Sequence, residues 1–302
     1  MRFKGTFDFV KTSRYFFITS IIITLLGIAS LAIFGLNYGV DFRSGTNADI
    51  KLTKQVDIAK VEELISSYKL DKPPVVTSGS ERMNIRFTEV LSEENESRLK
   101  EDFKKLDAGA SFEVSTVDVE IAREMQRNAI ISVFIASIGI IIYVSIRFEW
   151  RFAIAAVTAL LHDAFLVISV FSIFRLEVNL PFIIAILTII GYSINDTIVI
   201  FDRIRENLRF AKIKNIGDIA KLVNESIYQT LTRSINTVLT VLIAALCLYI
   251  FGSESISMFS LAIIIGLAFG AYSSIFIASP LWVVLKSKEK LGKPKAKTQE
   301  AQ

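Results

Sequence analysis

The sequence predicts a polytopic α-helical membrane protein that carries one small α+β domain between its first and second membrane-spanning helices. The mean hydropathy of the 302-residue chain is +0.50, and 52% of its residues are hydrophobic. This is more apolar than soluble domains of this size usually are. The hydrophobic residues form blocks of about 17 to 28 residues, and about 20 residues cross a bilayer as a helix. A single long polar segment, residues 37–128, interrupts the blocks.

Six blocks are long enough to cross a membrane. They are residues 15–36, 129–146, 152–174, 181–201, 235–251 and 258–285. We therefore predict one spanning helix over 15–36 and five more over 129–285, with a polar segment at 202–234 between the fourth and the fifth. A cleavable signal peptide is the competing interpretation of the first block. Its apolar core would be about 7 to 15 residues long, and this block is longer.

The distribution of basic residues predicts the orientation of the spans. Lys and Arg are frequent in four polar segments, which are 1–14, 147–151, 202–234 and 286–302. The short turns on the other side, 175–179 and 252–257, contain one basic residue, Arg175. Because loops rich in Lys and Arg stay in the cytoplasm, we predict a cell-membrane protein with both termini cytoplasmic, a basic cytoplasmic tail at 286–302 and residues 37–128 outside.

The polar segment reads as a ferredoxin-like domain. Its hydrophobic patterning alternates as expected for strands or repeats as expected for helices. The predicted order is β-α-β-β-α-β over residues 48–53, 57–69, 75–79, 83–89, 92–106 and 111–117. This order is typical of a split βαβ unit, and it needs no disulfide at this length.

Composition argues against several functions. One cysteine, Cys247, and one histidine leave no metal-ligand spacing and no internal disulfide. Segment 37–128 has a net charge of −4 and the rest of the chain +8, so the basic excess lies beside the spans and does not indicate nucleic-acid binding. We find no nucleophile–base arrangement, and we expect no enzyme activity and no cofactor other than protons as a coupling ion.

A carboxylate in the fourth span is the strongest candidate for function. Ionisable residues inside membrane spans are rare and commonly mark ion pathways. Asp196 follows Asn195 inside the apolar run, and Arg233 and Thr237 lie near the start of the fifth span. Polar residues at four-residue spacing share one face of a helix, so we expect the two polar faces to meet. Asp196 would then be ionised beside Arg233 and protonated when Arg233 withdraws. A static buried pair, or an Arg233 that reaches the headgroups, is the plainer alternative.

Three further features are candidates. Asp163 in the third span is either a second proton group or a hydrogen-bonding partner of Asn195 or Arg233. The preceding His162 points about 100° away on a helix, so we do not expect the two to form a dyad. The pair Gly266 and Gly270 permits close helix packing, more simply within the chain than in a dimer. The segment 217–234 reads as an amphipathic helix lying at the membrane surface.

Four segments carry a resemblance to the SecF side of the SecD/SecF family. They are VDFRSG at 40–45, GYSINDTIVIFDRIREN at 191–207, TLTRS at 230–234 and YSSIF at 272–276. The first segment is similar to a family turn that reads Asp-Phe-x-Gly-Gly, represented here by Asp41, Phe42 and Gly45. Ser44 stands where the family has the first glycine, so the backbone of this turn is open. The resemblance extends over the whole chain.

The resemblance implies half of an RND-type transporter that pairs with SecD around a pseudo-twofold axis. The pair would use the proton motive force to promote movement or release of exported, unfolded polypeptides through the SecYEG channel. YajC, YidC and membrane lipids are further partners that the family suggests. The resemblance assigns proton carriage to Asp196, with Arg233 as its charged partner.

Two other functions compete with this one. A lone RND-type exporter of lipids or drugs would have an external domain on both halves, and this sequence has one. A structural membrane subunit would use Asp196 and Arg233 as a permanent brace. Exchanging Asp196 for Asn separates the brace from the proton carrier.

Overall fold

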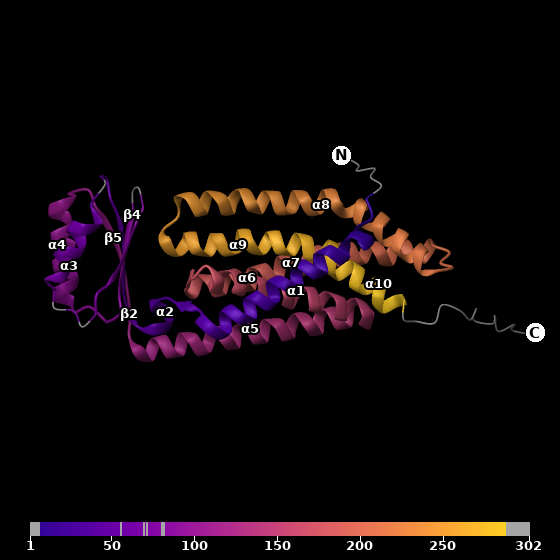
Figure 1. The fold of residues 1–302 in the computed structure, drawn as a ribbon, viewed down its shortest axis with the longest axis horizontal. Coiled ribbons are helices and arrows are strands. Elements are labelled where there is room, and N and C mark those ends of the chain that lie inside the picture. Colours follow the sequence, from indigo (N-terminus) through magenta and orange to yellow (C-terminus); the bar gives the residue numbers. More distant parts are fainter. Residues whose placement is uncertain (1–6, 55, 69, 71, 80–81, 288–302) are drawn as a thin grey trace, which may run out of the picture.

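The computed structural model describes residues 7–54, 56–68, 70, 72–79 and 82–287. Figure 1 shows a bundle of long helices with the α+β domain at one end and the last described helix toward the other. Within the described residues, six segments are long and apolar enough to cross a membrane. They are α1 (Phe9–Phe34), α5 (Val119–Arg147), α6 (Trp150–Ile173), α7 (Leu180–Phe210), α8 (Ile216–Phe251) and the combined segment Glu254–Ser287.

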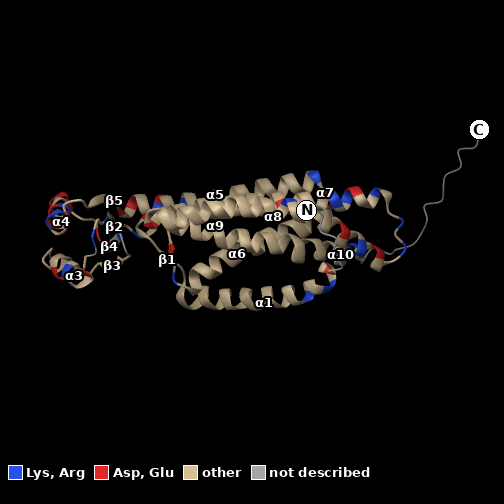
Figure 2. Cartoon of the chain, turned by 90° about the horizontal axis from the view of Figure 1, so that it is seen from above, with Lys and Arg blue, Asp and Glu red and all other residues tan. Residues whose placement is uncertain are grey.

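The charged residues are distributed according to the same division between the α+β domain and the helix bundle. Figure 2 shows charged residues gathered in the α+β domain and at the far ends of the helices, while the middle of the bundle is almost free of them. This arrangement is expected for helices that cross hydrocarbon, because charged side chains are costly there. The predicted polytopic helical fold is confirmed. Most of the predicted basic tail, from residue 288 onward, lies outside the described residues.

The helices extend past the hydrophobic blocks. Helix α1 begins at Phe9, where Asp8 accepts a hydrogen bond from the Lys11 backbone N–H as its N-cap. Helix α5 begins at Val119, with Asp118 as N-cap. Hydropathy locates the membrane-crossing part of a helix, whereas capping side chains decide where the helix begins. The starts predicted at residues 15 and 129 therefore lie inside these two helices.

The amphipathic segment 217–234 is not a separate surface helix. It forms the first half of α8, which runs without interruption to Phe251. Its start is fixed by a capping box between Asn215 and Asp218. Its apolar residues, including Ile219, Val223 and Ile227, are buried in the bundle core. The apolar face that suggested a lipid surface packs against protein.

The last span is interrupted. Helix α9 (Glu254–Ser273) passes into a π-helical segment, η1 (Ser274–Ala278), and then into α10 (Ser279–Ser287). A π-helical turn holds one extra residue and is common at functional sites. The hydrophobic pattern over residues 258–285 predicts one uninterrupted span and gives no sign of this π-helical segment.

The α+β domain has the predicted element order. It contains β2 (Gly45–Lys51), α3 (Ile58–Ser66), β3 (Val75–Ser78), β4 (Arg82–Phe87), α4 (Glu93–Leu106) and β5 (Ser111–Val117). The strands form an antiparallel sheet in the order β3-β4-β2-β5, which is the strand order of a ferredoxin-like unit. Ile50 and Ile85 from the sheet pack with Val61, Leu99 and Phe103 from the two helices.

Several contacts dock this domain onto the bundle. Strands β1 (Asn37–Tyr38) and β6 (Glu177–Val178) pair in parallel and join the end of α1 to the α6–α7 connection. A short helix, α2 (Val40–Arg43), follows β1. Arg86 on β4 forms an ion pair with Glu177. Asp49 on β2 accepts a hydrogen bond from the Glu254 backbone N–H at 3.0 Å.

The domain should lose stability in acid through Asp107. The carboxylate of Asp107 accepts hydrogen bonds from the Thr53 hydroxyl and backbone N–H, at 2.5 and 2.6 Å, and these bonds lower its pKa. A lowered folded-state pKa gives stability that is complete above the unfolded value of about 3.9 and is lost as the pH falls through the folded value. We expect Asp107→Asn to speed amide exchange in β2 at pH 7, with the difference shrinking below about pH 4 and disappearing only once the pH is below the lowered folded-state pKa. The exposed Glu113→Gln is the control, and an equal effect there would contradict the assignment.

Replacing Ser44 by glycine should stabilise the protein. Its φ of 64° and ψ of 154° lie in a region that is nearly restricted to glycine. We expect Ser44→Gly to stabilise the protein by about 1 kcal/mol and to raise the melting temperature by about 2–4 °C. Ser115→Gly in the exposed part of regular strand β5 should lower it, because glycine costs about 0.5–1 kcal/mol there. A lower melting temperature for Ser44→Gly would show that the turn is not strained.

Candidate functional site

Asp196 lies half-buried in the middle of α7. The Ser234 hydroxyl on α8 donates a hydrogen bond to its Oδ1. Its Oδ2 is buried without a hydrogen-bond partner among the described residues. Asp196 and Ser234 line a cavity of about 20 Å³ together with Thr237 of α8 and Gly266 of α9. This volume is enough for one water molecule.

The expected contact between Asp196 and Arg233 is not formed. Within the part of the chain that the structure describes, no ion pair joins them, and Arg233 is exposed. Consecutive residues point about 100° apart on a helix. Because Ser234 faces α7, the neighbouring Arg233 faces outward. The sequence pattern identified the correct segment of α8: Ser234 makes the hydrogen bond, and the charge of Arg233 acts on the Asp196 carboxylate without direct contact.

A polar stripe lies beside this acid on the outside of the bundle. We call it the α7–α8 face; its exposed members are Tyr192, Asn195, Arg233, Asn236 and Thr240. A Cβ atom added at Gly191 on the same side of α7 would meet nothing within 4 Å. Only 11% of the apolar window of α8 is buried. Polar groups at this depth are unfavourable against lipid, so this face requires cover.

Asp163 is buried more deeply, at 1% exposure. Its Oδ2 accepts hydrogen bonds from the Ser193 hydroxyl of α7 and the Ser273 hydroxyl of α9, both at 2.6 Å. The predicted partners, Asn195 and Arg233, are not the ones found.

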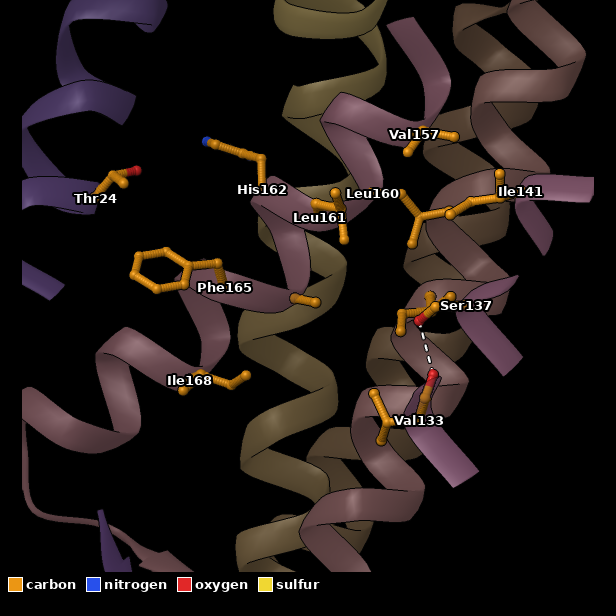
Figure 3. Close-up of a pocket in the computed structure, with 12 residues that line it drawn as sticks. Thr24, Val133, Ser137, Ile141, Val157, Leu160, Leu161, His162, Phe165 and Ile168 are labelled. Carbon is orange, nitrogen blue, oxygen red and sulfur yellow. Dashed lines mark hydrogen bonds between the residues drawn. The ribbon is translucent and has the colours of Figure 1, made fainter. Parts of the chain in front are cut away.

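His162 does contact Asp163, against the prediction. Its Nδ1 lies 3.0 Å from Asp163 Oδ1. The two Cβ directions diverge on the helix, but both side chains are long enough to turn toward each other. The ring also lines an apolar cavity of about 530 Å³ between α1, α5 and α6. Figure 3 shows His162 extending from α6 toward Thr24 of α1.

The paired glycines bring α7 and α9 together. A Cβ atom at Gly266 would overlap the Ile189 side chain, and one at Gly270 would approach Ser193 within 3.4 Å. Both neighbours are on α7 of the same chain. The close packing is therefore intramolecular, which was the simpler of the two interpretations.

The turn after α1 is tied to the helix that carries Asp196. Asp41 Oδ2 accepts a hydrogen bond from the Leu180 backbone N–H, at the first residue of α7, at 2.8 Å. A carboxylate is favourable at a helix N-terminus. Phe42 is buried, and a Cβ atom at Gly45 would overlap the Phe87 carbonyl oxygen. The motif residues thus position the start of α7 and the entry into β2.

The fold and site define a class. The described residues form a polytopic membrane protein with carboxylates between its spanning helices and a small α+β domain docked at one end, and carboxylates inside spans commonly mark ion pathways.

Comparison with known proteins narrows the class. The family model "Protein export membrane protein SecD/SecF, C-terminal" matches residues 98–288, and the "SecD/SecF GG Motif" model matches residues 29–56. The chain is 45% identical to protein translocase subunit SecF of Alicyclobacillus acidocaldarius, over 94% of both chains. It is 49% identical to the SecDF subunit of Bacillus subtilis, over 93% of this chain and 38% of the relative.

Solved structures of SecDF proteins support the same family assignment. The crystal structure of SecDF from Thermus thermophilus, described as a translocon-associated membrane protein, matches with a TM-score of 0.83 at 33% identity, over 94% of this chain and 39% of that one. The chain belongs to the SecD/SecF family, on its SecF side. It spans nearly the full length of the SecF relative from Alicyclobacillus acidocaldarius and less than half of the SecDF chains.

Proposed function

We propose that the chain is the SecF subunit of a proton-driven protein-export machine, with Asp196 as its proton-carrying group. One observation carries this proposal. The Asp196 carboxylate lies within a membrane-spanning helix, with one oxygen held by Ser234 and the other without a hydrogen-bond partner among the described residues, and the residue lines a cavity with room for one water. A carboxyl group in this position can bind a proton from water and release it without breaking the bundle. No cofactor is needed for that step.

Arg233 is the group that controls the proton. It is on the same helix as Ser234 but faces outward, so a rotation or a shift of α8 would bring its charge toward Asp196. A cation close by favours the ionised carboxylate, and its withdrawal favours the protonated one. The exposed state of Arg233 would thus correspond to the proton-loaded carboxyl.

SecD is the partner that covers the α7–α8 face. The exposed polar stripe at membrane depth supports this, as does the fusion of both parts in SecDF relatives. With this cover, Asp196, Asn195 and Arg233 would lie at the seam between the two halves. Lipid alone is a poor neighbour for this face.

The orientation follows from the basic loops. We place both termini in the cytoplasm and the α+β domain outside, where it would meet the polypeptide leaving SecYEG. YajC and YidC are further members of the assembly in this proposal. The chain would act on the exported, unfolded polypeptide as a translocase subunit and not as an enzyme.

Export into membrane vesicles tests the proposal. Native chain, Asp196→Asn and Asp196→Glu are each assembled with SecD and assayed with and without a proton gradient. We expect the Asn variant to lose the gradient-dependent part of export with SecD assembly intact, and the Glu variant to retain part of it. Asp202→Asn, near the end of α7, is the control. Full gradient-driven export by Asp196→Asn would exclude proton carriage, and loss of assembly would indicate a structural brace.

A further inference from the structure

A second chain of hydrogen bonds crosses the bundle away from Asp196. It begins at Ser20 on α1, whose hydroxyl lies 2.8 Å from the Tyr272 hydroxyl on α9. The Tyr272 hydroxyl lies 3.1 Å from His162 Nε2, and His162 Nδ1 lies 3.0 Å from Asp163 Oδ1. Ser193 and Ser273 complete it by donating to Asp163 Oδ2. The polar groups from Ser20 to Asp163 therefore form an unbroken series, each within hydrogen-bond distance of the next.

The surroundings of this chain contain few charges. The groups that face His162 and Asp163 from α1 are the hydroxyls of Ser20 and Thr24, and α7 supplies the Ser193 hydroxyl. Helix α9 supplies Tyr272 and Ser273, and the polar residue that α5 supplies to the cavity wall is Ser137. Among the described residues, neither Lys nor Arg forms an ion pair with Asp163, and the imidazole is the basic group in contact with this buried carboxylate.

Charge neutrality then decides the protonation state. A carboxylate buried at 1% exposure beside an apolar cavity costs several kcal/mol when its charge is uncompensated. Three hydrogen bonds reduce that cost but leave a net negative charge. One additional proton, placed on the imidazole or on the carboxyl, makes the pair neutral and keeps all of these contacts.

We propose that His162 and Asp163 form a second proton-holding site, in which one proton is shared between Nδ1 and Oδ1. In the loaded state Nε2 carries a hydrogen and donates to the Tyr272 oxygen, and Tyr272 donates to Ser20. When the proton leaves, Nδ1–H donates to the carboxylate, Ser20 donates to Tyr272, and Tyr272 donates to Nε2. The O–H bonds of Tyr272 and Ser20 reverse the direction in which they donate, and no heavy atom needs to move.

The site is connected to Asp196 through α7. Ser193, which holds the Asp163 carboxylate, precedes Asp196 by three residues on that helix, about 4.5 Å along its axis. A charge on one carboxylate disfavours a charge on the other. If Asp196 carries protons as proposed above, loss of the proton from one site therefore favours its retention at the other.

The single histidine of the chain makes the test direct. Histidine labelled with ¹⁵N in this chain alone gives one imidazole signal, recorded on the full chain in lipid bilayers with its SecD partner. We expect a protonated Nε2 at about pH 7 and a switch to an unprotonated Nε2 as the pH is raised. An unprotonated Nε2 throughout pH 6–8 would overturn the proposal, because it requires a neutral ring beside an ionised carboxylate.

Variants separate this site from the rest of the protein. Tyr272→Phe removes the hydrogen-bond partner of Nε2 in both states and should shift the Nε2 signal of each, whereas Tyr249→Phe, on the exposed side of α8, should leave the signal unchanged. Asp163→Asn should remove the pH dependence. Asp196→Asn removes the neighbouring carboxylate and should lower the pH at which Nε2 loses its hydrogen without abolishing the protonated state, so loss of gradient-driven export with His162 still protonated at lower pH would separate the two proposals. An identical response to Tyr272→Phe and Tyr249→Phe would contradict the hydrogen-bonded chain.

Discussion

Replacing Gly266 by leucine is expected to prevent stable folding of the bundle. Any side chain at this position overlaps Ile189, because α7 and α9 touch there. Extra methylenes in a packed interior cost about 1–3 kcal/mol even when they are few, so a whole leucine should cost at least about 3 kcal/mol. The separation of α7 from α9 would also open the cavity beside Asp196. Thermal unfolding followed by light scattering, together with the amount of protein in the membrane, measures the effect.

Gly139→Leu is the matched control for this prediction. Gly139 lies in a membrane-crossing helix, as Gly266 does, but a Cβ atom there meets nothing within 4 Å. It should leave the unfolding temperature within about 2 °C of the native value. Equal destabilisation by the two variants would show that the loss of glycine matters in itself and that the α7–α9 contact does not.

Removing Arg86 is expected to release the α+β domain from the bundle. The side chains of Arg86 and Glu177 are 20% and 11% exposed, and burial lowers the pKa of Arg86 while the nearby Glu254 carboxylate opposes that change. Loss of one partner from a largely buried pair leaves the other charge unpaired. We expect Arg86→Ala to reduce the free energy that docks the α+β domain onto the bundle by about 2 kcal/mol. This loss would be seen as about 30-fold faster amide exchange at Gly39 and β6.

The double variant Arg86→Met with Glu177→Gln should recover most of this loss, because no buried charge remains unpaired. Arg98→Ala breaks an ion pair with Asp102 in which the Arg98 side chain is 50% exposed, and it should change exchange in β6 by less than about twofold. If Arg98→Ala had as large an effect as Arg86→Ala, general surface charge, and not the Arg86–Glu177 pair, would hold the α+β domain on the bundle.

Hydrophobic patterning was sufficient for the architecture, because crossing a membrane requires about 20 apolar residues in a row. The order of elements in the α+β domain also followed from local patterns. Helix ends did not, since Asp8 and Asp118 act as caps that hydropathy does not detect. The π-helical segment Ser274–Ala278 has no local sequence signal; it results from packing against the other helices.

At the site, the ionisable residues were predictable and their contacts were not. Asp196 and Asp163 stand out as charges within apolar runs. Their partners Ser234, Ser193 and Ser273 are ordinary residues in membrane helices, where serine commonly bonds to its own backbone. The His162–Asp163 contact was missed because helical geometry fixes the direction of Cβ and not the reach of the side chain.

The ladder between β1 and β6 also has a consequence for biosynthesis. The β2–β5 sheet is complete in the growing polypeptide once Val117 has been made. Its anchor on the membrane part, where Asp41 meets Leu180, joins residues separated by 139 positions. The sheet can therefore form long before the ribosome has supplied the loop that receives it, and the newly folded domain must wait, tethered by its two flanking helices, until the fourth membrane crossing has been inserted.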